Sequence, residues 1–319
     1  MPTPLTTLPL PHLSTNTAWV FAGQGSQTPG MGRDIYEAFP ETRAIFESTA
    51  AGFDLKELCF EASAERLGDT RYTQAAMAAF AASVVLVLKN AGLNSSATCG
   101  LSLGEYSALH ASGVFDADTL LSLLGFRGAI MADASTLPSR MSAIFGLADE
   151  EVEKAVAEVA AKTGGIVSCT NYNCPGQVVI GGEETAVIEA EKLLTERKAR
   201  RCIPLNTSGA FHTALMNEAS VLLEARLNET NLAPQGIPVV FNVTAACAPD
   251  AEVRSLLARQ ISSPVRFAQS IKALEAAGIT RVLEIGPGKV LAGLFKKTAP
   301  GIEVISIETA ENLKEVIAL

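Results

Sequence analysis

Apolar and polar positions follow two different rhythms along the chain, and each rhythm predicts a different kind of domain. In the first rhythm, short apolar runs alternate with longer stretches in which apolar residues recur every three to four positions. The strand-length runs are AWVFAG (18–23), SATCGL (96–101), IPVVFNV (237–243) and TRVLEIGPG (280–288). The helical stretches are 33–50, 73–91, 103–112, 116–135 and a segment that begins at 213. Strands that alternate with helices predict an α/β fold with a mostly parallel sheet covered on both faces.

The middle of the chain follows a second rhythm with shorter spacing. The order there is strand, helix, strand, strand, helix, strand, which is the pattern of a ferredoxin-like fold. The strands are expected at 141–147, 165–173, 177–182 and 199–206, and the helices at 150–162 and 183–198. We therefore predict a larger domain over 18–138 and 208–319, with a smaller subdomain inserted at 139–207. Prolines and threonines in residues 1–17 predict a disordered tail.

The composition is that of a soluble enzyme and shows no targeting signal. Residues 1–18 contain no Lys or Arg, so the charged region of a secretory signal is missing. The longest apolar runs, such as AASVVLVL at 81–88, are shorter than the roughly 20 residues that a membrane span needs. We expect a cytoplasmic protein that does not bind a membrane.

Net charge and cysteine spacing exclude two further classes of protein. The formal charge of −9 argues against a nucleic-acid partner, because phosphate binding needs a concentrated basic surface. Basic residues cluster only at 196–201 and 296–297, where they either face solvent or bind an acidic partner. The cysteines lack CxxC spacing and only three histidines accompany them, so we expect reduced thiols and no metal site.

Candidate chemistry begins with the sequence GLSLG at 100–104, which has the form G-x-S-x-G. Between a strand and a helix this pattern is typical of a nucleophile elbow, although a serine in an ordinary turn would fit it too. A nucleophilic Ser102 needs a base. His12 lies in the predicted tail, and His110 lies ~12 Å along the same helix, beyond reach. His212 remains as the candidate base, and it lies at the junction of the two domains, where clefts form. The alternative is that His212 is only a packed or surface residue.

An acyl-transfer site also needs donors for an oxyanion and a way to recognise its substrate. In an elbow the N–H of the residue after the serine, here Leu103, is one donor. The loop GQGSQ (23–27) could supply the second. Arg127 lies on an otherwise apolar helix face, LLSLLGFRGAIM, where it either reaches solvent or pairs with an anion. A guanidinium fits a carboxylate through two parallel hydrogen bonds.

Eight short motifs in order resemble the malonyl-CoA:acyl-carrier-protein transacylase family over about residues 18–315. They are FAGQGSQ, GLSLGEYSAL, TQAAM, GFRGAIM, NYNCPGQVVI, SGAFHTALM, SSPVRF and EIGPGKVLAGL. The resemblance implies an α/β-hydrolase-like larger domain with a ferredoxin-like smaller one. It also implies a ping-pong reaction, in which malonyl passes from coenzyme A to a serine and then to the phosphopantetheine thiol of acyl carrier protein.

Matching the motifs residue by residue assigns the chemical roles that the family implies. Ser102 matches the nucleophile and His212 the base. The backbone N–H of Gln24 matches the second oxyanion donor, beside that of Leu103. The main-chain carbonyl of Gln260 matches the group that orients the histidine, in place of the carboxylate of a Ser-His-Asp triad.

The resemblance also assigns residues to the pocket that would hold the acyl group. Arg127 matches the residue that binds the malonyl carboxylate, and Gln74 matches a polar residue that lines the pocket. Phe211 narrows the pocket, and in the family this goes with malonyl rather than methylmalonyl units. Two positions depart from the family: Leu101 stands where His is usual, and Ala22 where Pro is commoner. Leu101 removes a polar group from the pocket and so bears on acyl specificity.

Three other functions remain open from the sequence. A free-standing acyltransferase of polyketide synthesis would use the same chemistry. A serine hydrolase, either a thioesterase or a patatin-like lipase, shares the elbow but has no use for a buried arginine at its acyl end. An inactive carrier-binding module would tolerate the loss of Ser102 or His212. The resemblance implies a monomer with no permanently bound cofactor.

Overall fold

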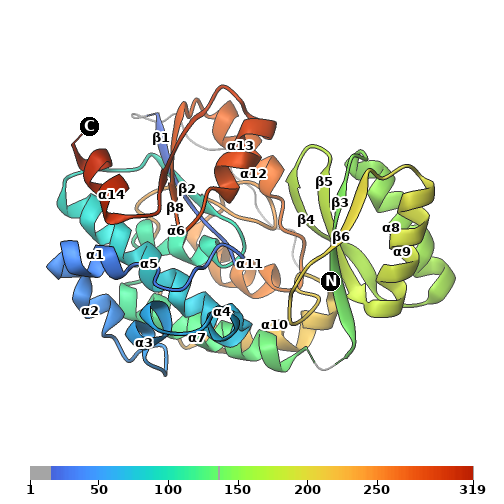
Figure 1. The fold of residues 1–319 in the computed structure, drawn as a ribbon, viewed down its shortest axis with the longest axis horizontal. Coiled ribbons are helices and arrows are strands. Elements are labelled where there is room, and N and C mark those ends of the chain that lie inside the picture. The colour runs from blue at the N-terminus through green and yellow to red at the C-terminus, as the bar shows by residue number, and fades with distance from the viewer. Residues whose placement is uncertain (1–15, 136, 319) are drawn as a thin grey trace.

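The computed structural model describes residues 16–135 and 137–318 of the 319-residue chain. They form a larger part built on a five-stranded sheet and a smaller part built on a four-stranded sheet, side by side (Figure 1). Most of the predicted tail (1–17) lies outside the described residues. The prediction is wrong for its last residue, Thr17, which belongs to a strand. It is the first residue of strand β1, where it pairs with Arg281.

The larger sheet is wholly parallel, with strand order β7-β2-β1-β8-β9. Its strands are β1 (Thr17–Phe21), β2 (Ala97–Gly100), β7 (Val239–Val240), β8 (Arg281–Ile285) and β9 (Glu303–Ile307). The prediction of a strand over 237–243 is too long, because the chain turns away after β7. The Phe241 N–H donates to the carbonyl of Ala246, and the Ala245 N–H donates back to Phe241.

Helices cover both faces of this sheet, as the sequence predicts. Helices α12 and α13 lie on the face turned toward the smaller part, whereas α1, α5 and α14 lie on the other side (Figure 1). The helices of the larger part are α1 (Arg33–Ala38), α2 (Arg43–Phe46), α3 (Leu55–Phe60), α4 (Ala64–Gly68), α5 (Thr70–Asn90), α6 (Gly104–Ala111), α7 (Ala117–Asp133), α10 (Asn217–Asn228), α11 (Val253–Gln260), α12 (Phe267–Ala276), α13 (Val290–Thr298) and α14 (Ala310–Ile317).

Two predicted helices differ from those observed. The stretch 33–50 is divided into α1, a 3₁₀ turn (Pro40–Thr42) and α2, because Pro40 forces extended backbone on Phe39. Helix α5 is 21 residues long, so the prediction that every apolar segment is too short to cross a membrane is wrong. Most of α5 is buried inside the protein, where it packs against α6 and α7 as a core helix.

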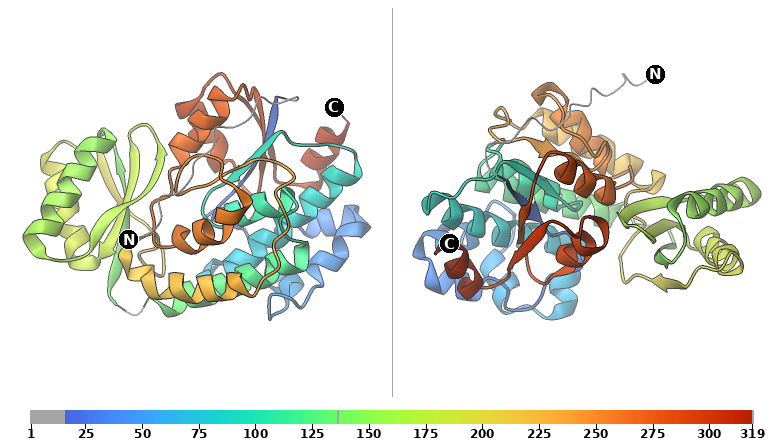
Figure 2. Two further views of the ribbon diagram at one scale, coloured as in Figure 1. Left: turned by 180° about the vertical axis from the view of Figure 1, so that it is seen from behind. Right: turned by 90° about the horizontal axis from the view of Figure 1, so that it is seen from above.

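The smaller sheet is antiparallel, with order β4-β5-β3-β6. Its elements are β3 (Ser139–Phe145), α8 (Asp149–Thr163), β4 (Val167–Cys174), β5 (Gln177–Glu183), α9 (Glu184–Glu196) and β6 (Arg201–Pro204). Helices α8 and α9 cover the face turned away from the larger part (Figure 2). This is the ferredoxin-like order of elements, so the α/β fold class with a second antiparallel sheet is confirmed.

The two faces of the smaller sheet belong to different cores. Ile144 and Ile180 pack with α8 and α9 in a small separate core, whereas Met141 and Val179 join the main core. The sheet is also tied to the larger part through main-chain bonds between β4 and Val265. The Tyr172 N–H donates to the Val265 carbonyl at 2.9 Å, and the Val265 N–H donates to Thr170 at 2.8 Å.

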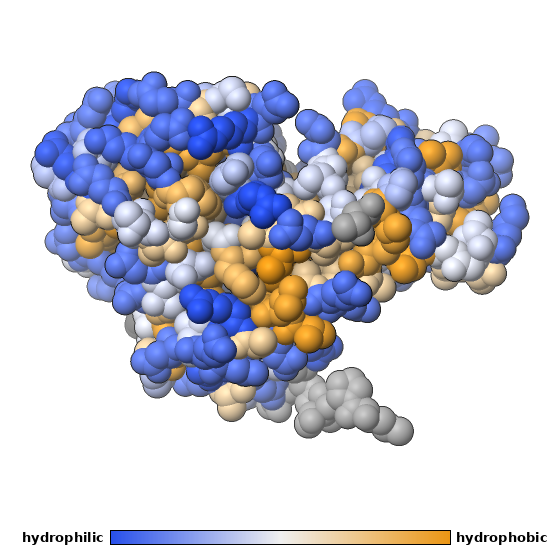
Figure 3. All heavy atoms as spheres, turned by 90° about the horizontal axis from the view of Figure 1, so that it is seen from below, coloured by the Kyte–Doolittle hydropathy of each residue, from blue (hydrophilic) through white to orange (hydrophobic). Residues whose placement is uncertain are grey.

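Polar side chains cover most of the outer surface. Figure 3 shows hydrophilic residues over much of one face and an apolar patch near the junction of the two parts. Among the described residues, the large apolar side chains that remain exposed are Leu137, Ile203, Leu205, Val221, Leu222 and Val290.

The turn between β2 and α6 explains the glycines on either side of Ser102. A Cβ on Gly100 would lie 2.1 Å from the backbone of Gly104, and a Cβ on Gly104 would lie 2.4 Å from the carbonyl oxygen of Phe21 in β1. Neither contact is possible for a real side chain. Ser102 itself has φ 55°, a left-handed conformation that L-residues rarely adopt. The chain therefore turns sharply and lifts Ser102 away from the sheet.

We predict that Gly104→Ala destabilises the protein by about 2–3 kcal/mol, because the new methyl group has to push helix α6 away from β1. Gly293→Ala is the matched control, since Gly293 lies in helix α13 with no atom near the added Cβ. The control is expected to be neutral or stabilising by up to ~1 kcal/mol. Urea unfolding of both variants measures the difference, and equal free energies of unfolding would contradict the close approach.

Candidate active site

A cleft of about 400 Å³ lies at the carboxyl ends of β1 and β2, between the two parts. In parallel sheets ligands bind at this edge, at the point where the chain passes to opposite sides of a central strand. Strand β1 is that strand here, with β2 on one side and β8 on the other. Eight of the nine predicted site residues line the cleft: Gln24, Gln74, Leu101, Ser102, Leu103, Arg127, Phe211 and His212. The ninth, Gln260, lies buried behind it.

The structure brings the predicted nucleophile and base into direct contact. Ser102 Oγ lies 2.9 Å from His212 Nε2, and His212 Nδ1 lies 2.8 Å from the main-chain oxygen of Gln260. Gln260 is the last residue of α11, and carbonyls at a helix C-terminus have no partner within the helix. This carbonyl accepts the Nδ1 proton of the imidazole and, at 3.3 Å, the N–H of Ser263. Nε2 is thereby left as the acceptor that faces the serine hydroxyl.

The histidine is held in its neutral form by its surroundings. Burial and the nearby positive charge of Arg127 lower the pKa of His212 to about 4. Its backbone also has φ 63°, and its N–H donates to the carbonyl of Ile261 at 2.9 Å. At neutral pH the ring is therefore fixed, uncharged and able to accept a proton.

Arg127 is buried at the bottom of the cleft, with 1% of its surface exposed. Its Nη1 donates to Gln74 Oε1 at 2.5 Å, and its Nη2 donates to Gln260 Oε1 at 2.9 Å and to Ser102 Oγ at 3.2 Å. The guanidinium also lies over the ring of Tyr106, 5.3 Å from its centroid. Among the described residues Arg127 forms no ion pair, and the groups in contact with its charge are neutral amides, a hydroxyl and an aromatic ring. The carboxyl of Glu105 acts on it from farther away, but burial raises the pKa of Glu105 to about 8, so that carboxyl is mostly uncharged at neutral pH.

An unneutralised cation in such a place favours an anionic ligand. Burial lowers the pKa of Arg127 because it disfavours the charged form. A carboxylate in the cleft would supply the missing negative charge and accept two hydrogen bonds from one guanidinium.

Two backbone N–H groups are available beside Ser102. Among residues 16–135 and 137–318, no hydrogen-bond partner engages the main-chain N–H of Gln24 or of Leu103. The loop that carries Gln24 is anchored by its side chain, because Gln24 Nε2 donates to Thr70 Oγ1 at 2.9 Å. Thr70 Oγ1 in turn lies 2.9 Å from Ser208 Oγ.

Part of the remaining wall is apolar and includes Leu101 and Phe211. Leu101 packs against the loop 23–27, where a Cβ on Gly23 would lie 2.5 Å from Leu101 Cδ2. On the side of the smaller sheet, the wall carries the uncharged amides Asn171, Asn173 and Gln177.

Sequence reasoning missed three residues that lie directly beneath the cleft: Glu105, Tyr106 and Asn242. All three are buried, and Asn242 is hydrogen-bonded to the N–H of Ser102 at 2.8 Å. It also missed that the Gln260 side chain donates to the Ser102 carbonyl at 2.9 Å. A signal existed, since Glu105 interrupts an apolar helix and Asn242 ends an apolar run, but nothing in the sequence pairs the two.

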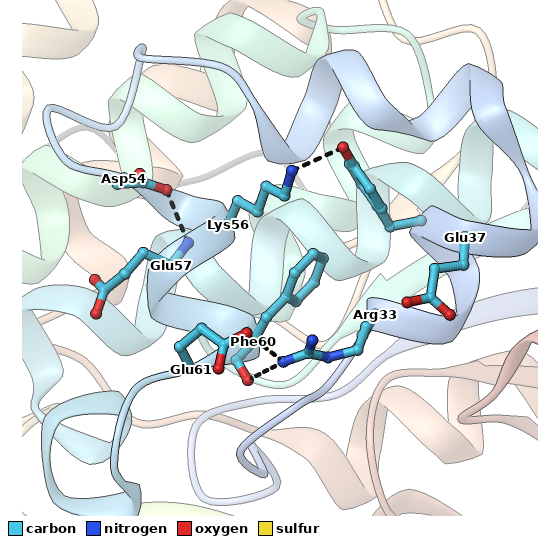
Figure 4. A pocket seen from close by; sticks show the side chains of 8 residues that line it. Arg33, Glu37, Asp54, Lys56, Glu57, Phe60 and Glu61 are labelled. Carbon is cyan, nitrogen blue, oxygen red and sulfur yellow. Dashed lines mark hydrogen bonds and ion pairs between the residues drawn. The ribbon is translucent and has the colours of Figure 1, made fainter.

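A second hollow on the surface has a different character. It lies over α1 and α3 and is lined mostly by charged residues, some of which pair with one another (Figure 4). Arg33 bonds Glu61 at 2.6 Å, and Lys56 donates to the Tyr36 hydroxyl at 2.9 Å. None of the predicted site residues reaches it. Among the described residues, no group of three or more His, Cys, Asp or Glu side chains could hold a metal ion.

Comparison with known proteins agrees with this geometry. The acyl transferase domain family matches residues 18–313. The chain belongs to that family. The malonyl CoA-acyl carrier protein transacylase of Bacillus subtilis is 38% identical over 304 residues, covering 94% of this chain and 96% of the relative. The resemblance stated from the sequence is thus confirmed, and the protein is an acyltransferase.

Solved structures of this family superimpose closely. The acyl carrier protein S-malonyltransferase of Vibrio cholerae has a TM-score of 0.91 and 37% identity, and the match covers 95% of this chain and all of that one. A malonyl-transacylase in complex with a type II polyketide-synthase acyl-carrier protein has a TM-score of 0.91 and 36% identity over 95% of this chain and 99% of that chain.

We predict that the reactivity of Ser102 in this acyltransferase stays constant as the pH falls from 8 to about 5, and is half lost near pH 4. The reason is that His212 must be neutral to accept the serine proton, and its pKa is lowered to about 4. The rate of labelling by phenylmethylsulfonyl fluoride measures this, with circular dichroism to verify that the protein stays folded. Arg127→Met should move the midpoint to higher pH, whereas a wild-type midpoint near 6.5 would contradict the assignment.

Proposed function

We propose that this acyltransferase moves a malonyl group from malonyl-CoA to the phosphopantetheine thiol of acyl carrier protein, through an ester on Ser102. The observation that carries the proposal is the buried, unneutralised guanidinium of Arg127, only 3.2 Å from the Ser102 hydroxyl. The names of the relatives in Bacillus subtilis and Vibrio cholerae support the same substrates. Malonyl differs from acetyl by the free carboxylate that such a cation would bind.

In the first half-reaction Ser102 Oγ attacks the thioester carbonyl carbon while His212 Nε2 takes the hydroxyl proton. The oxygen of the tetrahedral intermediate accepts hydrogen bonds from the N–H groups of Gln24 and Leu103. The C–S bond then breaks, and the proton on His212 passes to the departing thiolate of coenzyme A. The product is a malonyl ester on Ser102.

The second half-reaction reverses these steps with a different thiol. His212 Nε2 removes the proton from the phosphopantetheine thiol, and the sulfur attacks the ester carbonyl. The C–O bond breaks, and the Ser102 oxygen recovers its proton from His212. The Gln260 carbonyl keeps the ring in the tautomer that both halves require.

Partners and location follow from the same proposal. The amides Asn171, Asn173 and Gln177 suit the uncharged pantetheine arm that coenzyme A and the carrier share. The second partner is acyl carrier protein, and the carrier-bound relative supports this. One of the two basic clusters reaches this wall, since Lys297 Nζ lies 3.5 Å from Gln177 Oε1, and this supports the proposal that the cluster meets an acidic carrier. We propose a monomer in the cytoplasm that holds no permanent cofactor, in a fatty-acid or polyketide pathway.

Intact mass spectrometry tests the covalent intermediate. Mixing with malonyl-CoA should add one malonyl group to the protein, and adding holo acyl carrier protein should remove it. Ser102→Ala should add none, because it lacks the nucleophile. Discharge to water at the same rate without the carrier would make the protein a serine hydrolase instead.

Arg127→Ala should lower kcat/KM for malonyl-CoA by about 30- to 1,000-fold, which corresponds to ~2–4 kcal/mol of lost recognition. Transfer from acetyl-CoA should be kept or increased, since acetyl has no carboxylate for Arg127 to bind. Arg226→Ala is the control, because Arg226 donates to Ser122 Oγ and does not line the cleft. Equal losses with both donors would show that Arg127 supports only the fold.

A further inference from the structure

A single side chain, that of Asn242, holds the backbone on both sides of the nucleophile. Its Oδ1 accepts the N–H of Ser102 at 2.8 Å, and its Nδ2 donates to the carbonyl of Gly100 at 2.7 Å. These contacts join positions about 140 residues apart along the chain. They fix the backbone of Gly100 and of Ser102, on either side of Leu101, so the sharp turn is held at both residues.

The asparagine is itself held in place at its backbone. Its N–H donates to Glu105 Oε2 at 2.5 Å, and its carbonyl accepts the N–H of Arg266 at 2.9 Å. Glu105 belongs to the first turn of helix α6, directly after the elbow. Asn242 therefore contacts the end of the strand at Gly100, the nucleophile at Ser102 and the start of the helix at Glu105.

The register of the sheet explains how a residue so distant in sequence reaches this position. Strand β7 pairs with β2, and Val240 lies opposite Cys99. Asn242 follows two residues after Val240 and Gly100 follows Cys99, so both chains leave the sheet at the same edge. Asn242 is fully buried there, beneath the cleft and out of reach of substrate.

We infer that Asn242 is a positioning residue for acyl transfer, which holds Ser102 in its left-handed conformation and aims its hydroxyl at His212. The φ of 55° at Ser102 is disfavoured, so it persists only if surrounding contacts fix it. Because the N–H of Ser102 is bonded to Asn242, the N–H of Leu103 is the one that stays available for an oxyanion. This inference rests on the proposed function of Ser102 as nucleophile.

The position requires a group that accepts and donates at once. An amide does both, whereas an ionised Asp would accept only and would face the Gly100 carbonyl with a second acceptor. A protonated Asp can do both, since its carbonyl accepts and its hydroxyl donates. Asn242→Asp is therefore a variant of the same shape whose defect should depend on pH.

The first test compares the Asn242→Asp variant with the wild type in single-turnover acylation by malonyl-CoA. At pH 8 we expect the maximal acylation rate to fall roughly 100-fold, while half-saturation by malonyl-CoA changes less than about threefold, since the binding groups are intact. As the pH falls to about 5.5, the ratio of variant to wild-type rate should rise, because the buried Asp becomes protonated. Glu105, Arg127 and His212 share this network, and burial raises the pKa of Glu105 to about 8, so the wild-type profile over the same pH range measures what these groups contribute without the new carboxyl.

Two controls keep the result decisive. Asn94→Asp makes the same chemical change at an exposed asparagine and should leave the rate unaltered. Thermal unfolding of Asn242→Asp at both pH values gives the folded fraction by which each rate is normalised. A normalised rate equal to that of the wild type would overturn the inference, and so would a loss confined to half-saturation.

A second readout separates this inference from the proposed function. Phenylmethylsulfonyl fluoride reacts with an activated serine without using Arg127 or a carrier. Asn242→Asp should be labelled roughly 100-fold more slowly than the wild type at pH 8. If wild-type protein is labelled but takes no malonyl group, the proposed substrate is wrong and the positioning role is still tested. Equal labelling of variant and wild type would reject the role of Asn242.

Discussion

Helix α6 approaches strand β1 so closely at Gly104 that no side chain fits between them, and the site is organised around this contact. The contact leaves only a sharp turn between β2 and α6, and the turn requires Ser102 to adopt a left-handed backbone at a cost of about 1–2 kcal/mol. The buried bonds from Asn242 offset that cost. Because the serine stands on this turn, its hydroxyl projects above the sheet edge and meets a histidine that comes from a distant segment.

Charge distribution imposes the second constraint. Burying a guanidinium without an ion pair is unfavourable, and the groups in contact with it here, Gln74, Gln260 and the Tyr106 ring, supply only dipoles. The buried carboxyl of Glu105 acts on Arg127 only at longer range. Burial, together with the same positive charge, lowers the pKa of His212, which keeps the imidazole neutral. A negative substrate group would therefore stabilise the arginine and, by screening its charge, make the imidazole more basic at the moment when it must take a proton.

Much of this arrangement could be predicted from the sequence, for identifiable reasons. Ser102 stands between two glycines at the end of a strand, and Arg127 is conspicuous on an apolar helix. His212 is the one histidine left, because His12 falls in the predicted tail and helix geometry excludes His110. Positions whose role depends on a distant partner were not predicted. Asn242 and Glu105 are ordinary residues until the β2–β7 register brings them together. Strand β9 was missed because its edge position leaves it only partly buried, with a weak apolar pattern.

The main-chain bonds between β4 and Val265 link the wall of the cleft to the segment that supports His212. Val265 lies five residues after Gln260, whose carbonyl accepts the Nδ1 proton of His212, while β4 and β5 supply the amides that line the cleft. The smaller sheet and the histidine's support thus behave as one mechanical body. Swinging the sheet outward to admit a bulky carrier would pull on the base.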